Sequence, residues 1–496
     1  MKAWNKCDPK DQTIREFCYS LNCEEKLKEF APLFNPRSVA IIGASRTIGR
    51  GGNILVENLM KFGFRGAIYP INPSTEEILG LKAYPNIESV PGTVDLAVLN
   101  VPAKMTPQVV AECARKRVKY LLIIAGGFAE AGNAGKELQS TIVQKARVGG
   151  TRIIGPNIIG MISTESNLLL TFAPFEAVRK GHIGIIAQTG AFCGAALHYF
   201  LSFPDFKLSK SVDLGNQCDL SESEVLEYMM CDPETHVIML HMEGLRDGRR
   251  FLETAKLVSR KKPIVALKFG RTEVATKAIA SHTAALAGND NVYSAAFRQA
   301  GVVRVDDVDE AMYVARALSI CPLPIGNRVC VITFSGGAGA QAADLCYEND
   351  LTVPQLDERT LSEIKALSPP WMTITNPLDI WPAGEKSGDI GNTYAQAIRL
   401  AQTDANADAI MALINISYTP ITQSPEPERL AQAIGQLLKK PILVSAIGST
   451  KDLEHYTQAL EKIRIPVYPT VKSCVLALGG LWKYSRYRNQ TKDLYA

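Results

Sequence analysis

The sequence SVAIIGASRTIGRGGNILVENL, residues 38–59, joins a short apolar run to an amphipathic helical stretch through a glycine-rich turn. Similar β-branched runs bounded by Gly, Pro and Asn recur along the chain, and stretches with helical spacing of apolar residues separate them. Strands that alternate with helices predict parallel sheets covered by helices on both faces. This repeated unit assigns the chain to the α/β class.

The alternation restarts at HIGIIAQTG, residues 182–190, and again at RVCVITFSGG, residues 328–337. A chain of 496 residues also exceeds one ordinary core, because single cores stop growing at about 250–300 residues. The sequence therefore predicts three consecutive Rossmann-like or flavodoxin-like domains with parallel sheets, after a short helical N-terminal extension. The predicted boundaries are 1–34 for the extension, 35–175 for the first domain, 176–322 for the second and 323–496 for the third.

Composition and charge exclude several classes of partner. A formal net charge of +4, without a basic run interleaved with aromatic residues, argues against nucleic acid. Charged residues stand where a signal peptide needs its apolar stretch, and no uncharged apolar run reaches the roughly 18 residues of a membrane span. We therefore expect a cytoplasmic protein without a membrane partner. Its 11 cysteines lack metal-ligand spacing, which predicts reduced, mostly buried thiols and no metal site.

The turn after the first apolar run has the features of a phosphate site. Gly43 ends the run, Ser45 and Arg46 follow, and further glycines precede the helical stretch. Small residues let the backbone approach a phosphate, and a helix N-terminus offers free N–H groups. The NAD fingerprint has another glycine spacing and an acidic residue after the second strand, where this chain has Asn72. A nucleotide-like ligand other than NAD is favoured, and the alternative is a tight turn without a ligand.

Two later turns repeat this pattern of strand, glycine-rich turn and helix. Each offers an anion a helix N-terminus with unhindered amides, and two such ends facing one point would hold a phosphoryl group from both sides. Taken singly, each is equally well explained as a close-packed turn without a ligand. The candidate phosphate-binding residues are Gln188, Thr189, Gly190 and Ala191 in one turn, and Gly336, Gly337, Ala338 and Gly339 in the other.

His282 and Glu243 are the candidate reactive side chains. His282 stands in ASHTAALAG, a run of small residues that leaves its imidazole open to act as base, metal ligand or nucleophile. No carboxylate or cysteine lies at metal-ligand spacing from it, and the alternative is an accidental loop histidine. Glu243 ends an apolar run, where a carboxylate would hydrogen-bond one imidazole nitrogen and fix its tautomer. The alternative for Glu243 is a surface salt bridge with a nearby arginine.

Together these segments resemble the α subunit of the nucleoside-diphosphate-forming acyl-CoA synthetases, the acetate-CoA ligase (ADP-forming) branch of the succinyl-CoA synthetase superfamily. The segments that carry the resemblance, in chain order, are VAIIGASR, LKAYPNIESVPGTVDLAVLNVPA, RIIGPN, DPETHVIMLHMEGLRDGRRF, ASHTAALAG, YSAAFRQAGVVRVDDVDE and TNPLDIWP. The resemblance implies an acid-thiol ligase that interconverts acyl-CoA, ADP and phosphate with a carboxylic acid, CoA and ATP. The implied intermediates are an acyl phosphate and a phosphohistidine.

The resemblance also implies a role for each candidate. His282 matches the histidine that takes up the phosphoryl group, and Glu243 matches the carboxylate that orients it. The two later glycine-rich turns match the paired helix N-termini that hold the phosphoryl group. The first domain would bind CoA, which needs no ribose-binding carboxylate. The implied CoA-binding residues are Gly43, Ala44, Ser45, Arg46, Asn72, Pro73, Val101 and Pro102.

Five residues, in four segments, depart from the family pattern. Ile158 replaces a cysteine after the GPN motif, Ala284 replaces a glycine beside the histidine, Phe334 and Ser335 replace Asn-Ala, and His241 replaces a larger apolar or aromatic residue. These differences leave one alternative open, a paralogue that binds CoA as a sensor or scaffold without catalysis. A nicotinamide-dependent dehydrogenase is disfavoured by Asn72.

The resemblance finally implies a partner. In this superfamily an ATP-grasp module binds ATP or ADP with Mg²⁺, and a fused module would follow the third domain. The sequence ends at Ala496, soon after the segment LWKYSRYR of the third domain, so we expect a separate ATP-grasp β subunit in an α2β2 assembly. The identity of the acyl group is not readable from these motifs.

Overall fold

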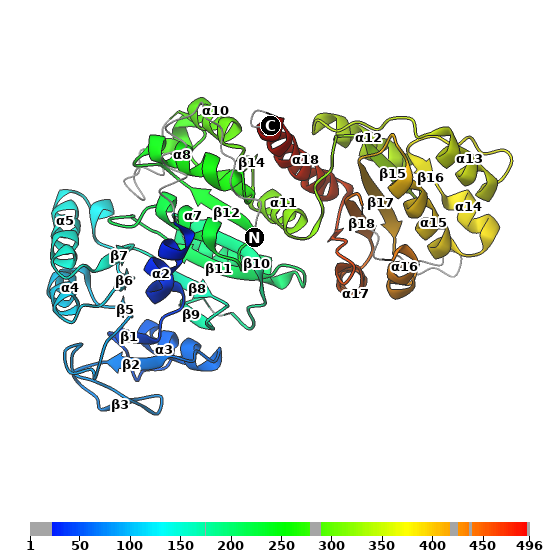
Figure 1. Ribbon diagram of the computed structural model, residues 1–496. Coiled ribbons are helices and arrows are strands. Elements are labelled where there is room, and N and C mark those ends of the chain that lie inside the picture. The colour runs from blue at the N-terminus through cyan, green and yellow to red at the C-terminus, as the bar shows by residue number, and fades with distance from the viewer. Residues whose placement is uncertain (1–21, 174, 278–288, 417–424, 436–438, 494–496) are drawn as a thin grey trace. The chain divides into compact units, whose positions relative to one another are not determined.

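The computed structural model describes residues 22–173, 175–277, 289–416, 425–435 and 439–493 (Figure 1). The chain divides into two compact units. One comprises Met1–Ser202 and Lys207–Val305, and the other comprises Phe203–Phe206 and Asp306–Ala496. The first unit holds two large sheets and one two-stranded sheet, and the second unit holds one large sheet, so the three predicted α/β domains are present in the predicted order.

The first sheet is parallel, with strand order β2-β1-β5-β6-β7. Its strands are β1 (Ser38–Ile42), β2 (Ala67–Ile71), β5 (Leu96–Leu99), β6 (Tyr120–Ile123) and β7 (Arg152–Ile154). Its helices are α3 (Gly51–Lys61), α4 (Thr106–Arg115) and α5 (Asn133–Val148), with short 3₁₀ turns η1 (Ala103–Met105) and η2 (Ala129–Ala131) and the small hairpin β3 (Glu77–Ile78) and β4 (Leu81–Lys82). Strand β1, which lies between β2 and β5, is buried throughout, as its apolar run predicts.

The middle sheet is mixed, with strand order β14-β13-β12-β10-β11-β8-β9. Its strands are β8 (Gly160–Ser163), β9 (Leu168–Thr171), β10 (Lys180–Ala187), β11 (Leu208–Asp213), β12 (Val237–Met242), β13 (Ile264–Lys268) and β14 (Val303–Val305). Its helices are the π-helical turn η3 (Phe192–Ala196), α6 (Leu197–Ser202), α7 (Glu222–Cys231), α8 (Gly248–Ser259) and α10 (Asp290–Ala300). The hairpin β8–β9 pairs antiparallel with β11, so the sheet of the second domain begins before residue 176.

The second unit is built on a parallel sheet with strand order β16-β15-β17-β18-β19. Its strands are β15 (Val329–Thr333), β16 (Leu378–Asp379), β17 (Ala409–Asn415), β18 (Ile442–Ile447) and β19 (Val467–Tyr468). Its helices are α11 (Val308–Ile320), α12 (Gly336–Glu348), α13 (Glu358–Leu367), α14 (Trp381–Ser387), α15 (Ile390–Thr403), α16 (Pro427–Ile434), α17 (Thr450–Glu461) and α18 (Val471–Asp493). Helix α18 packs closely on α11, because a Cβ atom at Gly480 would lie 2.5 Å from a Val314 methyl group.

The N-terminal extension contains the predicted helix, α2 (Cys23–Phe34). Asn22 caps it, and its first turn carries two acidic residues, which favour the positive end of the helix dipole. Phe30 and Phe34 are buried and stack on Tyr228 of α7, with ring centroids 5.2 and 4.3 Å apart. The Tyr120 hydroxyl donates to the Glu29 carbonyl at 3.0 Å. Helix α2 therefore contacts strand β6 of the first sheet and helix α7 of the middle domain.

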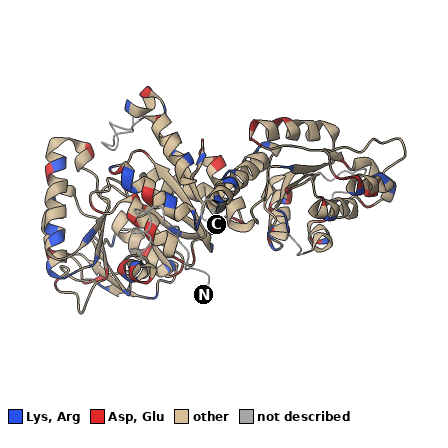
Figure 2. Cartoon of the chain, turned by 45° about the horizontal axis from the view of Figure 1, so that its top comes forward, with Lys and Arg blue, Asp and Glu red and all other residues tan. Residues whose placement is uncertain are grey.

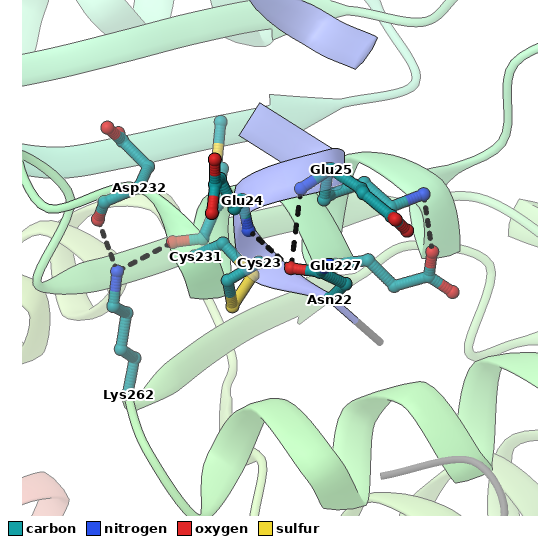
Figure 3. Close-up of a disulfide and its surroundings, with 10 residues drawn as sticks. Asn22, Cys23, Glu24, Glu25, Glu227, Cys231, Asp232 and Lys262 are labelled. Carbon is teal, nitrogen blue, oxygen red and sulfur yellow. Dashed lines mark hydrogen bonds and ion pairs between the residues drawn. A yellow bond between two sulfur atoms is a disulfide. The ribbon is translucent and has the colours of Figure 1, made fainter. Parts of the chain in front are cut away.

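The prediction that all cysteines are reduced thiols is wrong for one pair. Cys23, at the start of α2, forms a disulfide with Cys231, at the end of α7 (Figure 3). Lys26 of α2 also pairs with Glu227 of α7 at 3.2 Å. The pair is separated by 208 residues, so no local spacing motif reveals it. The remaining described cysteines are free thiols and mostly buried, as expected.

Breaking this disulfide is expected to lower the stability of the first unit. A cross-link across so long a loop stabilises a fold by about 2–5 kcal/mol, mainly by restricting the unfolded chain. Calorimetry with and without a thiol reductant should show the melting temperature falling by about 5–10 °C. The double variant Cys23→Ser/Cys231→Ser should melt at the lower temperature without reductant and respond to it no further. Equal melting temperatures for wild type and double variant would contradict this.

No helix among the described residues is long and apolar enough to cross a membrane. Acidic and basic residues both occur on the helices of each unit, in keeping with the small net charge (Figure 2).

Candidate functional site

The turn after β1 lies at the carboxyl edge of the first sheet, where ligands of open α/β sheets bind. Gly43 has φ +88°, and a Cβ atom there would lie 2.3 Å from the Asn100 carbonyl oxygen. A Cβ atom at Gly52, in the first turn of α3, would lie 2.1 Å from the Gly43 carbonyl oxygen. Both positions therefore require glycine, and this brings the α3 N-terminus directly against the end of β1. No side chain caps α3, so its first N–H groups are available to a ligand.

The other candidate CoA-binding residues surround this turn. Asn72, after β2, donates from Nδ2 to the Ala44 carbonyl at 2.8 Å and accepts from the Ser74 N–H at 2.8 Å. The Asn72 side chain therefore fixes the turn after β1. It stands at the position where NAD-binding proteins have an acidic residue. Val101, after β5, lies within 3.3 Å of a Cβ atom built at Gly43. The structure thus brings Gly43, Ala44, Ser45, Arg46, Asn72, Pro73, Val101 and Pro102 to the adjacent ends of β1, β2 and β5.

Glu243 lies at the carboxyl end of β12 in the middle sheet and is 5% exposed. The side chain of Gln188, at the end of the neighbouring strand β10, holds the backbone there. Its Oε1 accepts from the N–H groups of Glu243 at 2.6 Å and Gly244 at 3.0 Å, and its Nε2 donates to the Gly244 carbonyl at 2.8 Å. The Gln188 side chain therefore positions the turn that carries Glu243, a role that its place in a glycine-rich turn did not predict.

Asp213 is a buried carboxyl group at the same edge, at the end of β11. It accepts from the N–H groups of Ile159 at 2.7 Å and Gly215 at 3.1 Å. A Cβ atom at Gly190 would lie 3.4 Å from Asp213 Oδ2, so the second glycine-rich turn packs on this carboxyl group. The pKa of Asp213 is raised to about 7, mainly by burial and to a smaller extent by the nearby Glu243 carboxylate. The hydrogen bonds from the two N–H groups act in the opposite direction and lower this pKa. Sequence patterns gave no signal for this residue.

The raised pKa of Asp213 predicts a pH-dependent stability. The folded chain holds this proton more tightly than the unfolded chain, whose pKa is near 3.8, so the stabilisation is complete below pH 4 and is lost as the pH rises to about 7. The melting temperature of Asp213→Asn, minus that of wild type, should therefore increase between pH 4.5 and 8. Thermal melts across this range measure the difference, and parallel curves would contradict the assignment.

His241 lies two residues before Glu243 on β12, and Lys268, at the end of the neighbouring strand β13, interacts electrostatically with Glu243. His241 is fully buried, stacks on Phe192 with ring centroids 5.1 Å apart and meets Phe269 edge-on at 4.6 Å. Burial, together with Lys268, lowers the pKa of His241 to about 3, so the ring is neutral. Burial likewise lowers the pKa of Lys268 to about 8, although Asp290 opposes this, and its ammonium lies 4.6 Å from the Tyr293 ring centroid.

The third glycine-rich turn belongs to the second unit. Gly336, Gly337, Ala338 and Gly339 form the first turn of α12, whose N-cap Ser335 makes no side-chain cap bond. Thr333 fixes the entry to this turn, because its hydroxyl accepts from the Ser335 N–H at 3.1 Å and donates to the Ser335 carbonyl at 2.9 Å. The turn therefore has the unhindered helix N-terminus that the sequence predicts. Its approach to the turn at Gln188 stays a prediction.

His282 lies outside the described residues, and its role as phosphoryl acceptor stays a prediction. Around it in the sequence, the structure describes the chain up to residue 277 and again from 289. Glu243, Gln188, Gly190 and Asp213 come together at the carboxyl edge of the middle sheet.

Three family models match consecutive parts of the chain. They are a CoA binding domain at residues 37–164, a succinyl-CoA ligase like flavodoxin domain at 180–318 and a ligase-CoA domain at 329–491. The three matches follow the order of the three sheets.

Known proteins are similar over most of the chain. Acetate–CoA ligase [ADP-forming] I subunit alpha of Pyrococcus furiosus is 40% identical over 93% of this chain and 99% of its own length. Acetate–CoA ligase [ADP-forming] II of Archaeoglobus fulgidus is 39% identical over 94% of this chain and 68% of its own length. A dinucleotide forming acetyl-coenzyme A synthetase 1 of Ca. Korarchaeum cryptofilum, solved in complex with phosphate and ADP, is 34% identical, with a TM-score of 0.84 over 94% of this chain and 99% of that one.

Proposed function

This chain belongs to the family of ADP-forming acyl-CoA synthetases and is similar to their α subunits, and on this premise we propose that it catalyses the acyl and phosphoryl transfers of such an enzyme. The reaction interconverts acyl-CoA, ADP and phosphate with a carboxylic acid, CoA and ATP. An acyl phosphate and a phosphohistidine at His282 are the proposed intermediates. The observation that carries the proposal is the buried Glu243 side chain at the carboxyl edge of the middle sheet, where Gln188 holds the backbone of Glu243.

The described residues fit a role in each part of this reaction. The cradle of Gly43 and Gly52 at the uncapped α3 N-terminus suits the phosphates of CoA, whose thiol supplies the leaving group of the acyl transfer. Glu243 would accept a hydrogen bond from the imidazole of His282, which would fix the tautomer of the ring and stabilise its positive charge. The N–H groups at Thr189 to Ala191 and at the start of α12 would hold the phosphoryl oxygens.

Splitting the transfer into two steps keeps the free energy of the thioester. Phosphate attacks the thioester carbonyl and releases the CoA thiol, and the imidazole then takes the phosphoryl group and releases the carboxylate. One difficult transfer is thereby divided into two easier steps. Positioning and electrostatic stabilisation supply most of the rate in such a loose phosphoryl transition state.

We further propose a separate ATP-grasp β subunit as the partner, because the similar Pyrococcus furiosus proteins are named α subunits. That subunit would bind ATP or ADP with Mg²⁺. An α2β2 assembly is the proposed stoichiometry, and sedimentation of the co-expressed chains measures it.

The experiment is CoA-dependent release of ADP from ATP by the chain assembled with this partner, over a panel of small carboxylic acids. We expect release with at least one acid, acetate being the first to test. Binding of CoA without ADP release for any acid would instead support the non-catalytic sensor or scaffold.

A further inference from the structure

A chain of hydrogen bonds joins the first domain to the turn that carries Glu243. It runs through three residues, Glu130 after β6, Asn216 after β11 and Arg246 after β12, which we call the Asn216 bridge. Asn216 Nδ2 donates to Glu130 Oε2, and the Asn216 carbonyl accepts from Arg246 Nη2 at 2.8 Å. All three residues belong to the first unit.

The orientation of the Asn216 amide is fixed by its surroundings. Its Nδ2 also donates to Gln139 Oε1 at 3.1 Å, and that oxygen accepts from the Ala129 N–H at 3.4 Å. Two acceptors therefore face the same amide edge, and only the NH₂ group satisfies both. Asn216 is 8% exposed, so these bonds are shielded from water.

On the first-domain side, the bridge fixes a turn at the ligand edge of the sheet. Glu130 Oε1 accepts from the N–H groups of Gly127 at 2.6 Å and Phe128 at 3.1 Å. Burial acts to raise the pKa of Glu130, but hydrogen bonds from Asn216 and the backbone outweigh it and keep the pKa low. The carboxylate thus holds the turn 127–130 from one side and receives Asn216 on the other.

On the other side, the bridge completes the support of the Glu243 turn. Gln188 holds its first residues, Glu243 and Gly244, and Asn216 holds Arg246. The Asn216 N–H also donates to the Pro156 carbonyl at 2.9 Å. The loops that meet here have several residues at positive φ, namely Gly127, Gly132, Gly155, Asn157, Gly215 and Gln217. Such conformations concentrate at functional sites.

We propose that Asn216 is a positioning residue that holds the 127–130 turn of the CoA-binding domain in register with Glu243. This inference rests on the proposed function. The proposal predicts different effects on two reactions. Transfer that starts from a thioester bound to the first domain requires the 127–130 turn to be held in position relative to Glu243. Transfer to His282 from free acyl phosphate requires only that Glu243 itself is in place.

The test compares two sources of the phosphoryl group for labelling the chain assembled with its partner. One donor is acetyl-CoA with labelled phosphate and the other is labelled acetyl phosphate. Asn216→Leu removes the donors, and Asn216→Asp places two carboxylates together. Both should slow labelling from acetyl-CoA by about tenfold or more, because small displacements of reacting groups are costly. Labelling from acetyl phosphate should stay within about twofold of wild type.

A reciprocal exchange makes the test sharper. In Asn216→Asp/Glu130→Gln the new amide donates to the new carboxylate, and its oxygen still accepts from Gly127 and Phe128. The Gln139 amide turns over to donate to that carboxylate, which gives up only the long bond from the Ala129 N–H at 3.4 Å. This double variant should regain acetyl-CoA labelling to within about threefold of wild type. Asn86→Leu, at an exposed side chain that caps Ser89, is the matched control and should label normally from both donors.

The outcomes separate the two proposals. Normal acetyl-CoA labelling in both single variants, no recovery in the double variant, or equal loss from both donors with a lower melting temperature would each overturn the positioning role. A wild-type complex that releases ADP with acetate but labels from neither donor would instead overturn the proposed function, because turnover would then bypass the phosphohistidine.

Discussion

Replacing His282 with alanine is expected to abolish labelling of the chain by acetyl-CoA and phosphate, to below about one hundredth of the wild-type level. The imidazole is the proposed nucleophile, and alanine offers no atom that can carry the phosphoryl group. The label on wild type should be acid-labile and base-stable, as a phosphoramidate is. Autoradiography of the separated chain after acid or base treatment measures this.

The matched control for His282→Ala is His455→Asn. His455 is an exposed histidine of the second unit that pairs with Glu428 at 2.8 Å, far from any proposed chemistry in sequence. It should label as wild type does. Undiminished label in His282→Ala would remove the phosphohistidine from the account.

Replacing Glu243 with glutamine has the second largest expected effect, a fall of about 10²- to 10³-fold in the rate of labelling, the usual cost of losing one preorganised electrostatic partner. Glutamine keeps the shape, and Gln188 still holds the backbone through the N–H groups of Glu243 and Gly244. The loss should therefore fall on the rate of chemistry with little change in melting temperature. Rapid-quench labelling and calorimetry on the same preparation measure both.

Glu253→Gln serves as the matched control for Glu243→Gln. Glu253 lies on α8, is 39% exposed and pairs only with the neighbouring Arg249 among the described ion pairs. It should leave the labelling rate unchanged. If Glu243→Gln labels as fast as this control, Glu243 does not orient the histidine.

The fold was predictable because its signal is local. Each sheet of the structure contains buried apolar runs that end at a glycine-rich turn, as at Ile42–Gly43 and Thr333–Gly336. The strand end at Glu243 was also visible, since an apolar run stops there. The hairpin β8–β9 was not, because its antiparallel pairing with β11 depends on contacts across the middle sheet.

The residues that hold the site in place were not predictable, because they too depend on contacts between segments that are distant in the sequence. Gln188 holds Glu243 because β10 and β12 are neighbours in the sheet, although 55 residues separate them. Asp213 and Asn216 act through the Pro156–Ile159 loop, and no spacing rule connects these segments. The Cys23–Cys231 disulfide likewise depends on α2 folding back on α7. These contacts exist only once the sheets have assembled.

The central claim is that this chain carries a phosphoryl group on His282 during turnover. The most direct measurement is tandem mass spectrometry, under mildly basic conditions, of peptides from the wild-type complex quenched after mixing with acetyl-CoA and phosphate. We expect the added phosphoryl group on the peptide that contains His282, with fragment ions placing it on that residue. A complex that turns over while carrying the group on another residue, or on none, would contradict it.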